Sequence, residues 1–192
     1  MTRKLRVAVV GLGVGKGHLE SYAKIPDHFE VKAVCDLDAA KAKAAAEQFG
    51  IARHTTQLNS LLASNELDII DICTPPNTHR ALIEQVLAAG LHVICEKPLV
   101  GSLTDADAIA AAQKSAKGTL FPIFQYRFGN GLQRLKHLQA KGFASKALVT
   151  TMETHWRRDA DYYAIQWRGK WATEMGGCCL THASHSHDIL SY

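Results

Sequence analysis

The stretch from Asp68 to Val100 places two short apolar runs on either side of a helical pattern. The first run, Ile69–Cys73, has the length and β-branched content of a strand that is buried on both faces. A helix is predicted from about Thr78 to Ala89, and a second apolar strand from His92 to Cys95. Strand, helix and strand this close together predict a right-handed crossover between parallel strands, and ligands of such sheets bind beyond the carboxyl ends of the strands.

Two short motifs follow those two strands directly. Thr74-Pro75-Pro76 ends the first strand, because proline supplies no N–H to a strand ladder. Glu96-Lys97-Pro98 follows the second strand. Both motifs therefore fall at the edge of the sheet where a ligand is expected.

The alternation of strand and helix continues on both sides of this unit. Further strands are expected at residues 5–10, 31–35 and 120–124, with a short one between 51 and 64. About six alternating strands predict an α/β fold with a doubly wound parallel sheet, a Rossmann fold. Residues 1–123 are assigned to this nucleotide-binding domain, and one further strand is predicted at 146–153.

A glycine-rich turn, Gly11-Leu12-Gly13-Val14-Gly15-Lys16-Gly17, follows the first strand. Such a turn lets the backbone approach a pyrophosphate, and the helix after it offers its N–H groups to the negative charge. Candidate cofactor-binding residues here are Gly11, Gly13, Val14 and Gly15. The usual third glycine would stand where this chain has Lys16, so the turn is a variant, and a plain structural connection is the alternative.

Asp36 stands at the end of the second strand. A carboxylate there accepts hydrogen bonds from ribose hydroxyls and repels a 2′-phosphate, which favours NAD over NADP. Lys41 and Lys43 keep NADP binding open as a second option. The structural alternative is that Asp36, together with Asp38, only caps the helix predicted over residues 39–49.

The composition argues against several other classes of protein. The formal charge of +4 is spread along 192 residues without a basic block, which argues against nucleic-acid binding. No apolar run is long enough to span a membrane. Five cysteines without a CxxC pair favour reduced thiols and a cytoplasmic location. An unrelated nucleotide-binding domain, such as a methyltransferase, is the remaining alternative at this point.

Several motifs occur together along the chain. They are the strand followed by Gly-Leu-Gly, Asp36, and the segments DICTPPNTH at 71–79, LAAGLHVICEKPL at 87–99, QYRF at 125–128 and GGCCLTHASHSHD at 176–188. Together they resemble the glucose-fructose oxidoreductase, inositol dehydrogenase and MocA family. The resemblance implies an NAD(P)-dependent dehydrogenase that moves a hydride between nicotinamide and a secondary hydroxyl of a sugar, sugar nucleotide or cyclitol.

The resemblance also implies roles for residues at the functional edge. Lys97 would lie beside the nicotinamide and the substrate hydroxyl, where an ammonium stabilises developing alkoxide charge. Glu96 would contact the nicotinamide side of the cofactor, and a cis peptide bond would precede Pro98. Further cofactor contacts are implied for Thr74, Pro75, Asn77 and His79.

The second catalytic element of the family places an acidic or amide residue four positions before a histidine that acts as general base. Here the histidine is His185, and the earlier position is Thr181. An i, i+4 pair lies on one helix face, so Thr181 is expected to orient His185. Thr181 brings no charge, so His185 should be a weaker base unless Asp188 takes over that part.

Substrate contacts implied by the resemblance come from Lys97 and His185 together with Arg127, Trp167 and Arg168. Zinc-ligand residue types also gather near the end of the chain, at Cys178, Cys179, His182, His185, His187 and Asp188. Their spacing fits no standard zinc motif, so no metal is expected.

The residues after Phe124 are too few for the large antiparallel sheet that this family usually carries as a second domain. The resemblance therefore implies a truncated chain, in which residues 124–192 form an incomplete α+β second domain for substrate binding and oligomerisation. It also implies a homo-oligomer for a full-length form. A catalytically silent dinucleotide-binding or regulatory fragment of the same fold is the alternative function.

Overall fold

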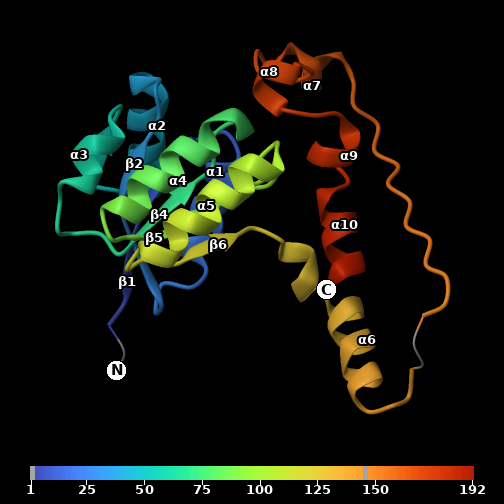
Figure 1. The fold of residues 1–192 in the computed structure, drawn as a ribbon. Helices are drawn as coiled ribbons and strands as arrows, with labels where there is room; N and C mark the ends of the chain where they lie inside the picture. Colours follow the sequence, from blue (N-terminus) through green and yellow to red (C-terminus); the bar gives the residue numbers. More distant parts are fainter. Residues whose placement is uncertain (1–2, 145–146) are drawn as a thin grey trace. The chain divides into compact units, whose positions relative to one another are not determined.

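The computed structural model describes residues 3–144 and 147–192. The described chain forms two compact units, and the boundary in the sequence falls between Pro122 and Ile123. The amino-terminal unit contains the sheet, whereas the regular structure of the carboxyl-terminal unit is helical (Figure 1).

The sheet consists of six parallel strands in the order β3-β2-β1-β4-β5-β6 (Figure 1). The strands are β1 Leu5–Val10, β2 Phe29–Cys35, β3 Arg53–Thr55, β4 Ile69–Ile72, β5 His92–Cys95 and β6 Leu120–Pro122. This is the strand order of a doubly wound dinucleotide-binding fold, whose direction of winding reverses between β1 and β4. The predicted Rossmann fold is confirmed.

Helices connect successive strands. They are α1 Gly15–Ala23, α2 Ala39–Phe49, α3 Leu58–Leu62, α4 His79–Ala88 and α5 Leu103–Ser115, with the 3-10 turn η1 Pro76–Thr78 before α4. Local chemistry sets the ends of α2, because the Asp38 carboxylate accepts from the Lys41 N–H at 3.1 Å and Gly50 adopts the left-handed conformation after the last turn. Ser102 caps α5 in the same way, through the Asp105 N–H at 3.1 Å.

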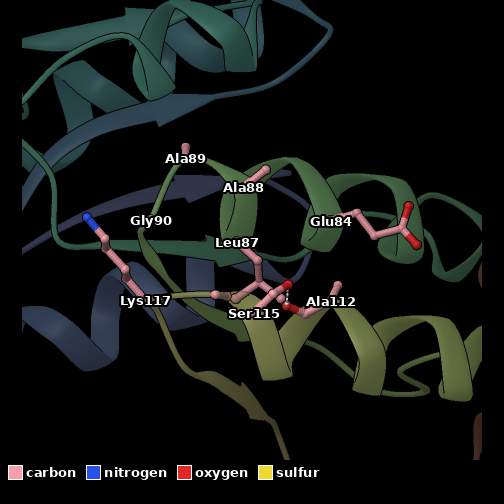
Figure 2. Close-up of a pocket in the computed structure, with 9 residues that line it drawn as sticks. Glu84, Leu87, Ala88, Ala89, Gly90, Ala112, Ser115 and Lys117 are labelled. Carbon is pink, nitrogen blue, oxygen red and sulfur yellow. Dashed lines mark hydrogen bonds between the residues drawn. The ribbon is translucent and has the colours of Figure 1, made fainter.

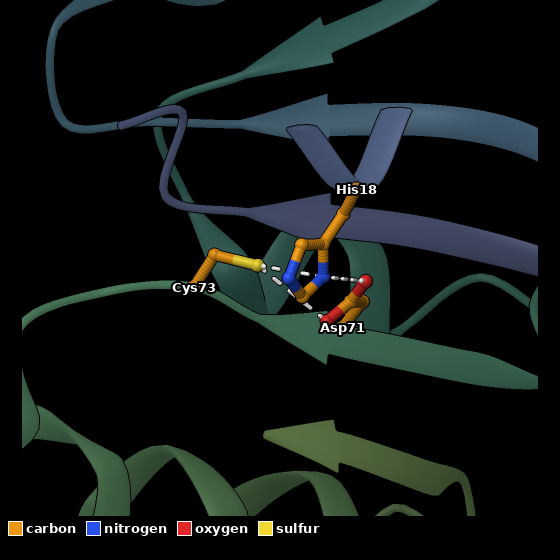
Figure 3. A group of neighbouring side chains, drawn as sticks. All are labelled: His18, Asp71 and Cys73. Atoms are coloured by element: carbon orange, nitrogen blue, oxygen red, sulfur yellow. Dashed lines mark hydrogen bonds and ion pairs between the residues drawn. The ribbon is translucent and has the colours of Figure 1, made fainter. Parts of the chain in front are cut away.

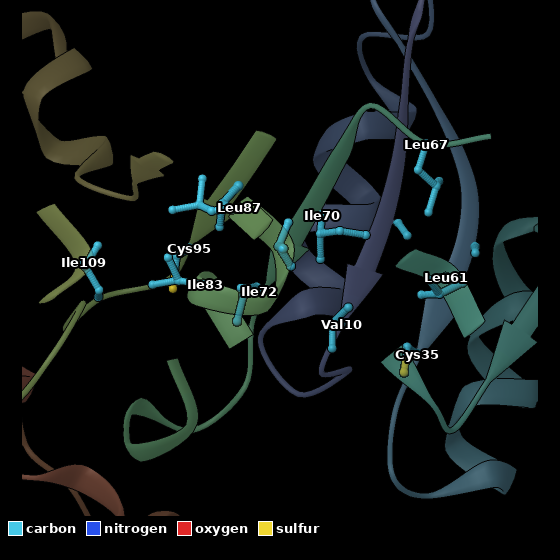
Figure 4. Close-up of a cluster of buried hydrophobic side chains, with 14 residues drawn as sticks. Val10, Cys35, Leu61, Leu67, Ile70, Ile72, Ile83, Leu87, Cys95 and Ile109 are labelled. Atoms are coloured by element: carbon cyan, nitrogen blue, oxygen red, sulfur yellow. The ribbon is translucent and has the colours of Figure 1, made fainter. Parts of the chain in front are cut away.

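Two separate apolar layers hold the helices against the sheet. Along β1, Val7 and Val9 face the layer formed with α1 and α2, and Ala8 and Val10 face the layer formed with α3, α4 and α5. Figure 4 shows the second layer, where Ile83 and other α4 side chains pack on strand residues. Burial on both faces explains why these strands are continuous apolar runs.

The carboxyl-terminal unit is described by the 3-10 turn η2 Gln125–Phe128 and the helices α6 Asn130–Ala140, α7 Ala160–Ala164, α8 Trp171–Glu174, α9 Cys178–Thr181 and α10 Ser184–Ser191. The predicted strand at 146–153 is wrong for residues 147–153, which have no regular structure; Lys146 lies outside the described residues. Leu148 is 94% exposed and Val149 87% exposed. A β-branched run without a neighbouring strand forms no ladder, whatever its propensity.

Within the described residues, no helix combines the length and the apolar composition that crossing a bilayer requires.

Candidate functional site

The glycine turn joins β1 to α1 at the carboxyl edge of the sheet. Gly11 has φ +88°, and a Cβ on it would lie 2.7 Å from the Cys73 carbonyl oxygen, so this position requires glycine. A Cβ on Gly15 would lie 2.9 Å from Val9 Cγ1. Gly15 therefore allows the close helix–strand packing that the standard fingerprint assigns to its third glycine, one position later. Apart from the neighbouring residues in the chain, no described atom lies within 4 Å of a Cβ built on Gly13, so the turn leaves room there.

Helix α1 starts inside this turn. Its N-cap residue is Val14, and no described side chain caps its first N–H groups. The N–H groups at a helix start, beside a glycine turn with open space, are suited to bind the pyrophosphate of a dinucleotide.

Asp36 follows β2 and its carboxylate binds the glycine turn. One oxygen accepts from the Leu12 N–H at 2.8 Å and lies 3.2 Å from Lys41 Nζ, and the other accepts from the Asp38 N–H at 3.1 Å. Burial acts to raise the pKa of Asp36, but these partners outweigh it and lower the pKa below its ordinary value. The helix cap is Asp38, so the capping alternative does not account for Asp36.

The Thr74-Pro75-Pro76 segment is held in place by His79. The His79 ring lies with Nε2 2.9 Å from the Thr74 carbonyl oxygen and Nδ1 3.0 Å from that of Pro98. Burial lowers the pKa of His79. The side chain is fully buried and has no surface that a ligand could contact. His79 therefore joins the Thr74 and Pro98 loops, and the predicted direct contact with a cofactor is not available to it. The predicted neighbours Thr74, Pro75 and Asn77 do lie at this edge.

Glu96 and Lys97 follow β5 at the same edge. Glu96 Oε2 accepts from the Lys97 N–H at 2.9 Å, and the Lys97–Pro98 peptide bond is cis. The amino-terminal unit thus brings the glycine turn, Asp36 and the Glu96-Lys97 pair to one edge of one sheet, because all of them follow carboxyl ends of parallel strands.

A buried polar cluster lies beneath this edge. His18 from α1 points at Asp71 and Cys73 from β4 and the residues after it (Figure 3). His18 Nδ1 lies 2.8 Å from Asp71 Oδ2 and 3.3 Å from Cys73 Sγ, and Nε2 lies 3.2 Å from Glu96 Oε1. No role was predicted for His18. The available signal was Asp71 itself, an acidic residue inside an otherwise apolar strand, which must find a buried partner.

The His18 cluster contains ligand types that metals accept, and its donor atoms are close together. The 2.8 Å separation of Nδ1 and Oδ2 is that of a charge-assisted hydrogen bond, with a proton between the two atoms. Burial raises the pKa of the Cys73 thiol to about 12, so this sulfur remains a neutral S–H. The polar atoms of the protonated cluster are therefore hydrogen-bonded to one another, without a metal ion.

In the carboxyl-terminal unit, His185 is 3% exposed and stacks on Tyr126 with ring centroids 4.3 Å apart. Thr181 belongs to α9 and His185 to α10, so the prediction that they share one continuous helix face is wrong. The reason is the break in the helix at His182 and Ala183. The Thr181 hydroxyl donates to the Gly177 carbonyl oxygen at 3.2 Å and lies 3.0 Å from His182 Nδ1.

Arg127 binds Asp188 through two hydrogen bonds, one of them 2.7 Å from Nε to Oδ2. The pair ties η2 to α10, and it raises the pKa of Arg127 further. Asp188 thus pairs with Arg127, and not with His185 as the sequence suggested. The Arg127 side chain is 38% exposed, so its predicted contact with substrate stays a prediction.

Two arginines of the same unit stack on aromatic rings. The Arg168 guanidinium carbon lies 4.1 Å from the Trp167 ring centre and 4.2 Å from that of Tyr162. That of Arg158 lies 4.8 Å from the Tyr162 ring centre. His182 Nε2 lies 3.0 Å from the Tyr162 hydroxyl, so this histidine belongs to the aromatic cluster, whereas His185 stacks elsewhere.

A cavity of about 350 Å³ lies at the carboxyl-terminal ends of α4 and α5 (Figure 2). Helix α4 ends where the chain enters β5, so the cavity lies at the amino ends of the strands, away from the glycine turn. It is lined mostly by small residues and by the ends of two helices, with Glu84 and Lys117 at its rim (Figure 2). Since α4 begins at the functional edge and runs back along the sheet, this cavity is no part of the candidate site.

Comparison with protein-family models gives a match over residues 5–124 to the glucose-fructose oxidoreductase, inositol dehydrogenase and MocA model, an oxidoreductase family with an NAD-binding Rossmann fold. The chain belongs to this family. The match covers β1 to β6, which include every element that positions the glycine turn, Asp36 and the Glu96-Lys97 pair. The predicted family and the NAD cofactor are confirmed.

Relatives within the family include dehydrogenases of sugars and cyclitols. The chain is 30% identical over 194 residues to the myo-inositol 2-dehydrogenase of Thermotoga maritima, covering 98% of this chain and 54% of that enzyme. Among solved structures, it resembles the WlbA dehydrogenase of Bordetella pertussis in complex with NADH and UDP-GlcNAcA, with 32% identity, a TM-score of 0.92, and coverage of 100% of this chain and 55% of that one. The WlbA dehydrogenase of Chromobacterium violaceum, solved with the same two ligands, has 34% identity, a TM-score of 0.86 and the same coverage. The chain spans about half the length of these relatives.

Proposed function

We propose that this chain binds NAD through its amino-terminal unit and contributes to the oxidation of a secondary hydroxyl group on a sugar, sugar nucleotide or cyclitol. The observation that carries the proposal is the gathering of the glycine turn, Asp36 and the Glu96-Lys97 pair at one edge of a Rossmann sheet. Residues 1–123 would hold the cofactor, and residues 124–192 would supply part of the substrate site.

The residues present fit NAD. The α1 N-terminus and the space at Gly13 suit the pyrophosphate, and Asp36 suits the ribose hydroxyls of adenosine. Gly11, Val14 and Gly15 shape the turn, and Thr74, Pro75 and Asn77 would flank the cofactor further along the edge. Glu96 and Lys97 would face the nicotinamide. NADP remains a weaker alternative because Lys41 is already paired with Asp36.

NAD, when bound, supplies the acceptor for the hydride of the carbinol carbon. Lys97 would hold the substrate oxygen and stabilise the negative charge that develops on it. His185 would take the hydroxyl proton as general base, positioned by its stacking on Tyr126. Thr181 would act on His185 only indirectly, through the short helix α9.

An anionic sugar nucleotide is the substrate class that the carboxyl-terminal unit favours. Arg168 and Trp167, with Arg158 and Tyr162, combine cationic and aromatic groups that suit a phosphate or a carboxylate beside a ring. Arg127 would add a third cation. The two WlbA structures contain UDP-GlcNAcA, a ligand of this class, which supports the proposal.

A second candidate is a silent dinucleotide-binding or regulatory protein of the same fold. Thr181 favours it, because this residue stands where the family pattern has an acidic or amide group. The reduced cysteines support a cytoplasmic location for either function, and we expect a full-length form to be a homo-oligomer.

Titration of the purified chain with NAD and NADP by calorimetry tests the cofactor proposal. NAD should bind more tightly, and failure of a folded chain to bind either nucleotide would refute it.

Reduction of NAD in the presence of UDP-GlcNAcA or myo-inositol, followed by absorbance, separates the enzyme from the silent protein. In the enzyme, Lys97→Met should abolish turnover and leave NAD binding within a few fold; the silent protein binds NAD and turns over neither compound.

A further inference from the structure

His18 contacts two carboxylates at once. Its Nδ1 lies 2.8 Å from Asp71 Oδ2, and its Nε2 lies 3.2 Å from Glu96 Oε1. Asp71 is fully buried, and it accepts a further hydrogen bond from the Tyr22 hydroxyl at 2.9 Å. The ring therefore links α1, which starts in the glycine turn, to β4 and to the end of β5.

These contacts require a particular protonation state. A neutral imidazole has one N–H, whereas here both ring nitrogens face carboxylate oxygens. Burial lowers the pKa of His18, but its hydrogen bonds to Asp71, Cys73 and Glu96 outweigh this and raise the pKa to about 12. Burial acts to raise the pKa of Glu96, yet His18 and the Lys97 N–H lower it below its usual value. An imidazolium between two carboxylates follows from the geometry.

Glu96 transmits this contact to Lys97. One oxygen of Glu96 faces His18, while the other accepts from the Lys97 N–H at 2.9 Å. The Glu96 N–H donates to the Ile72 carbonyl oxygen at 2.9 Å, so the backbone of Glu96 is fixed by the sheet and its carboxylate by His18. The direction of the Glu96 side chain, and the start of the loop that carries Lys97, therefore depend on the ring.

We propose that His18 is a positioning residue of the dehydrogenase site, which holds the Glu96-Lys97 pair in register with the glycine turn through its charged contacts to Asp71 and Glu96. This rests on the proposed function, because Glu96 and Lys97 are assigned to the nicotinamide end of NAD. Without the imidazolium, two carboxylates share a buried region with no cation between them, and the Glu96 side chain is free to turn toward the ligand.

ADP-ribose separates the two ends of the site. It contains the pyrophosphate and both riboses of NAD but lacks nicotinamide, so it reports on every part of the cofactor site except the nicotinamide contacts. His18→Gln should weaken NAD on the order of tenfold more than it weakens ADP-ribose. Tyr22→Phe is the matched control: it removes a hydrogen bond from the same Asp71 but leaves the imidazolium, and it should keep the ratio of the two affinities unchanged.

A merely structural role for His18 predicts a lower melting temperature and an equal loss of both affinities, and that outcome overturns the inference while the proposed function stands. Binding of neither ligand by the unaltered chain overturns both the inference and the proposed function.

Nitrogen NMR of the unaltered chain at pH 8 gives a measurement that does not depend on the variant. Both His18 ring nitrogens should carry protons there, and a neutral ring would refute the proposal even if His18→Gln fails to fold.

Discussion

Gly13 lies in the glycine turn and Gly17 in the first turn of α1. Apart from chain neighbours and the backbone of α1 itself, no described atom is within 4 Å of a Cβ built on either one. Gly13→Ala should leave the free energy of unfolding within about 0.5 kcal/mol of its original value, since the added methyl group meets no protein atom. NAD affinity should fall at least about tenfold, because the backbone at this position approaches the pyrophosphate. Calorimetric titration and thermal melting measure both quantities.

Gly17→Ala is the control for that experiment. It adds the same methyl group within α1, where alanine favours the helix by up to about 1 kcal/mol, and NAD affinity should stay unchanged. Equal NAD affinities for Gly13→Ala and the unaltered chain would mean that the pyrophosphate does not lie over this turn.

Lys41 bears on the choice between NAD and NADP, because its ammonium lies 3.2 Å from the Asp36 carboxylate. Removing this cation in Lys41→Ala leaves more negative charge where a 2′-phosphate would lie. The ratio of NAD to NADP affinity should therefore rise several-fold in Lys41→Ala, and Asp36→Ala should bring it close to one. Each substitution should change the difference in binding free energy between NAD and NADP by about 1 kcal/mol or more. If neither substitution changes the ratio of NAD to NADP affinity, the adenosine ribose does not bind beside Asp36.

At the scale of single residues, the sequence predicted the glycine turn and the Glu96-Lys97 pair because each is a short contiguous motif, and Asp36 because it ends a predicted strand. The His18 cluster was missed, since its partners Asp71 and Glu96 stand 53 and 78 positions away along the chain. Only the packing of α1 on the sheet brings them together. The same is true of His79, whose burial between two loops is a property of the folded unit.

At the scale of secondary structure, α2 depends on its cap. Asp38→Ala removes the acceptor for the Lys41 N–H and should lower the free energy of unfolding by about 1 kcal/mol, as measured by urea denaturation. Lys43→Ala, at an exposed position of the same helix, should change it by less than about 0.5 kcal/mol. Equal effects would show that the cap does not stabilise α2.

The helices and strands of the amino-terminal unit were predictable from their apolar patterns. Each helix buries one apolar face against the sheet, and the central strands are buried on both faces. The misses lie in the carboxyl-terminal unit. Residues 147–153 have strand-like composition, but they lack a neighbouring strand among the described residues, and a ladder depends on its partner rather than on local sequence. The break between α9 and α10 falls within a run of short polar residues that does not signal a helix end.

At the scale of the whole molecule, Asp68 ties the starts of β1 and β4. It accepts from Arg6 through the backbone N–H at 2.8 Å and the guanidinium at 2.9 Å, and the Arg6 and Arg3 partners hold the pKa of Asp68 well below its usual 3.8. A lowered pKa contributes stability that is present above about pH 4 and is lost as the pH falls toward the folded value.

Asp68→Asn should therefore lower the free energy of unfolding at pH 7 by about 1 to 2 kcal/mol, with the exposed Arg3 contact adding little. The variant should also lose less stability than the original chain between pH 4 and pH 2.5, when urea denaturation is followed at each pH. Parallel losses for the two chains would assign the acid sensitivity to other carboxylates.

The strand order has a consequence for how the chain folds during synthesis. β1 is synthesised before the other strands and ends in the middle of the sheet, with β2 on one side and β4 on the other. Each strand that follows then finds an edge already made by an earlier strand: β3 joins β2, β5 joins β4 and β6 joins β5. The sheet can thus grow outward in the order of translation, so each strand of the amino-terminal unit after β1 finds a pairing partner that has already been synthesised.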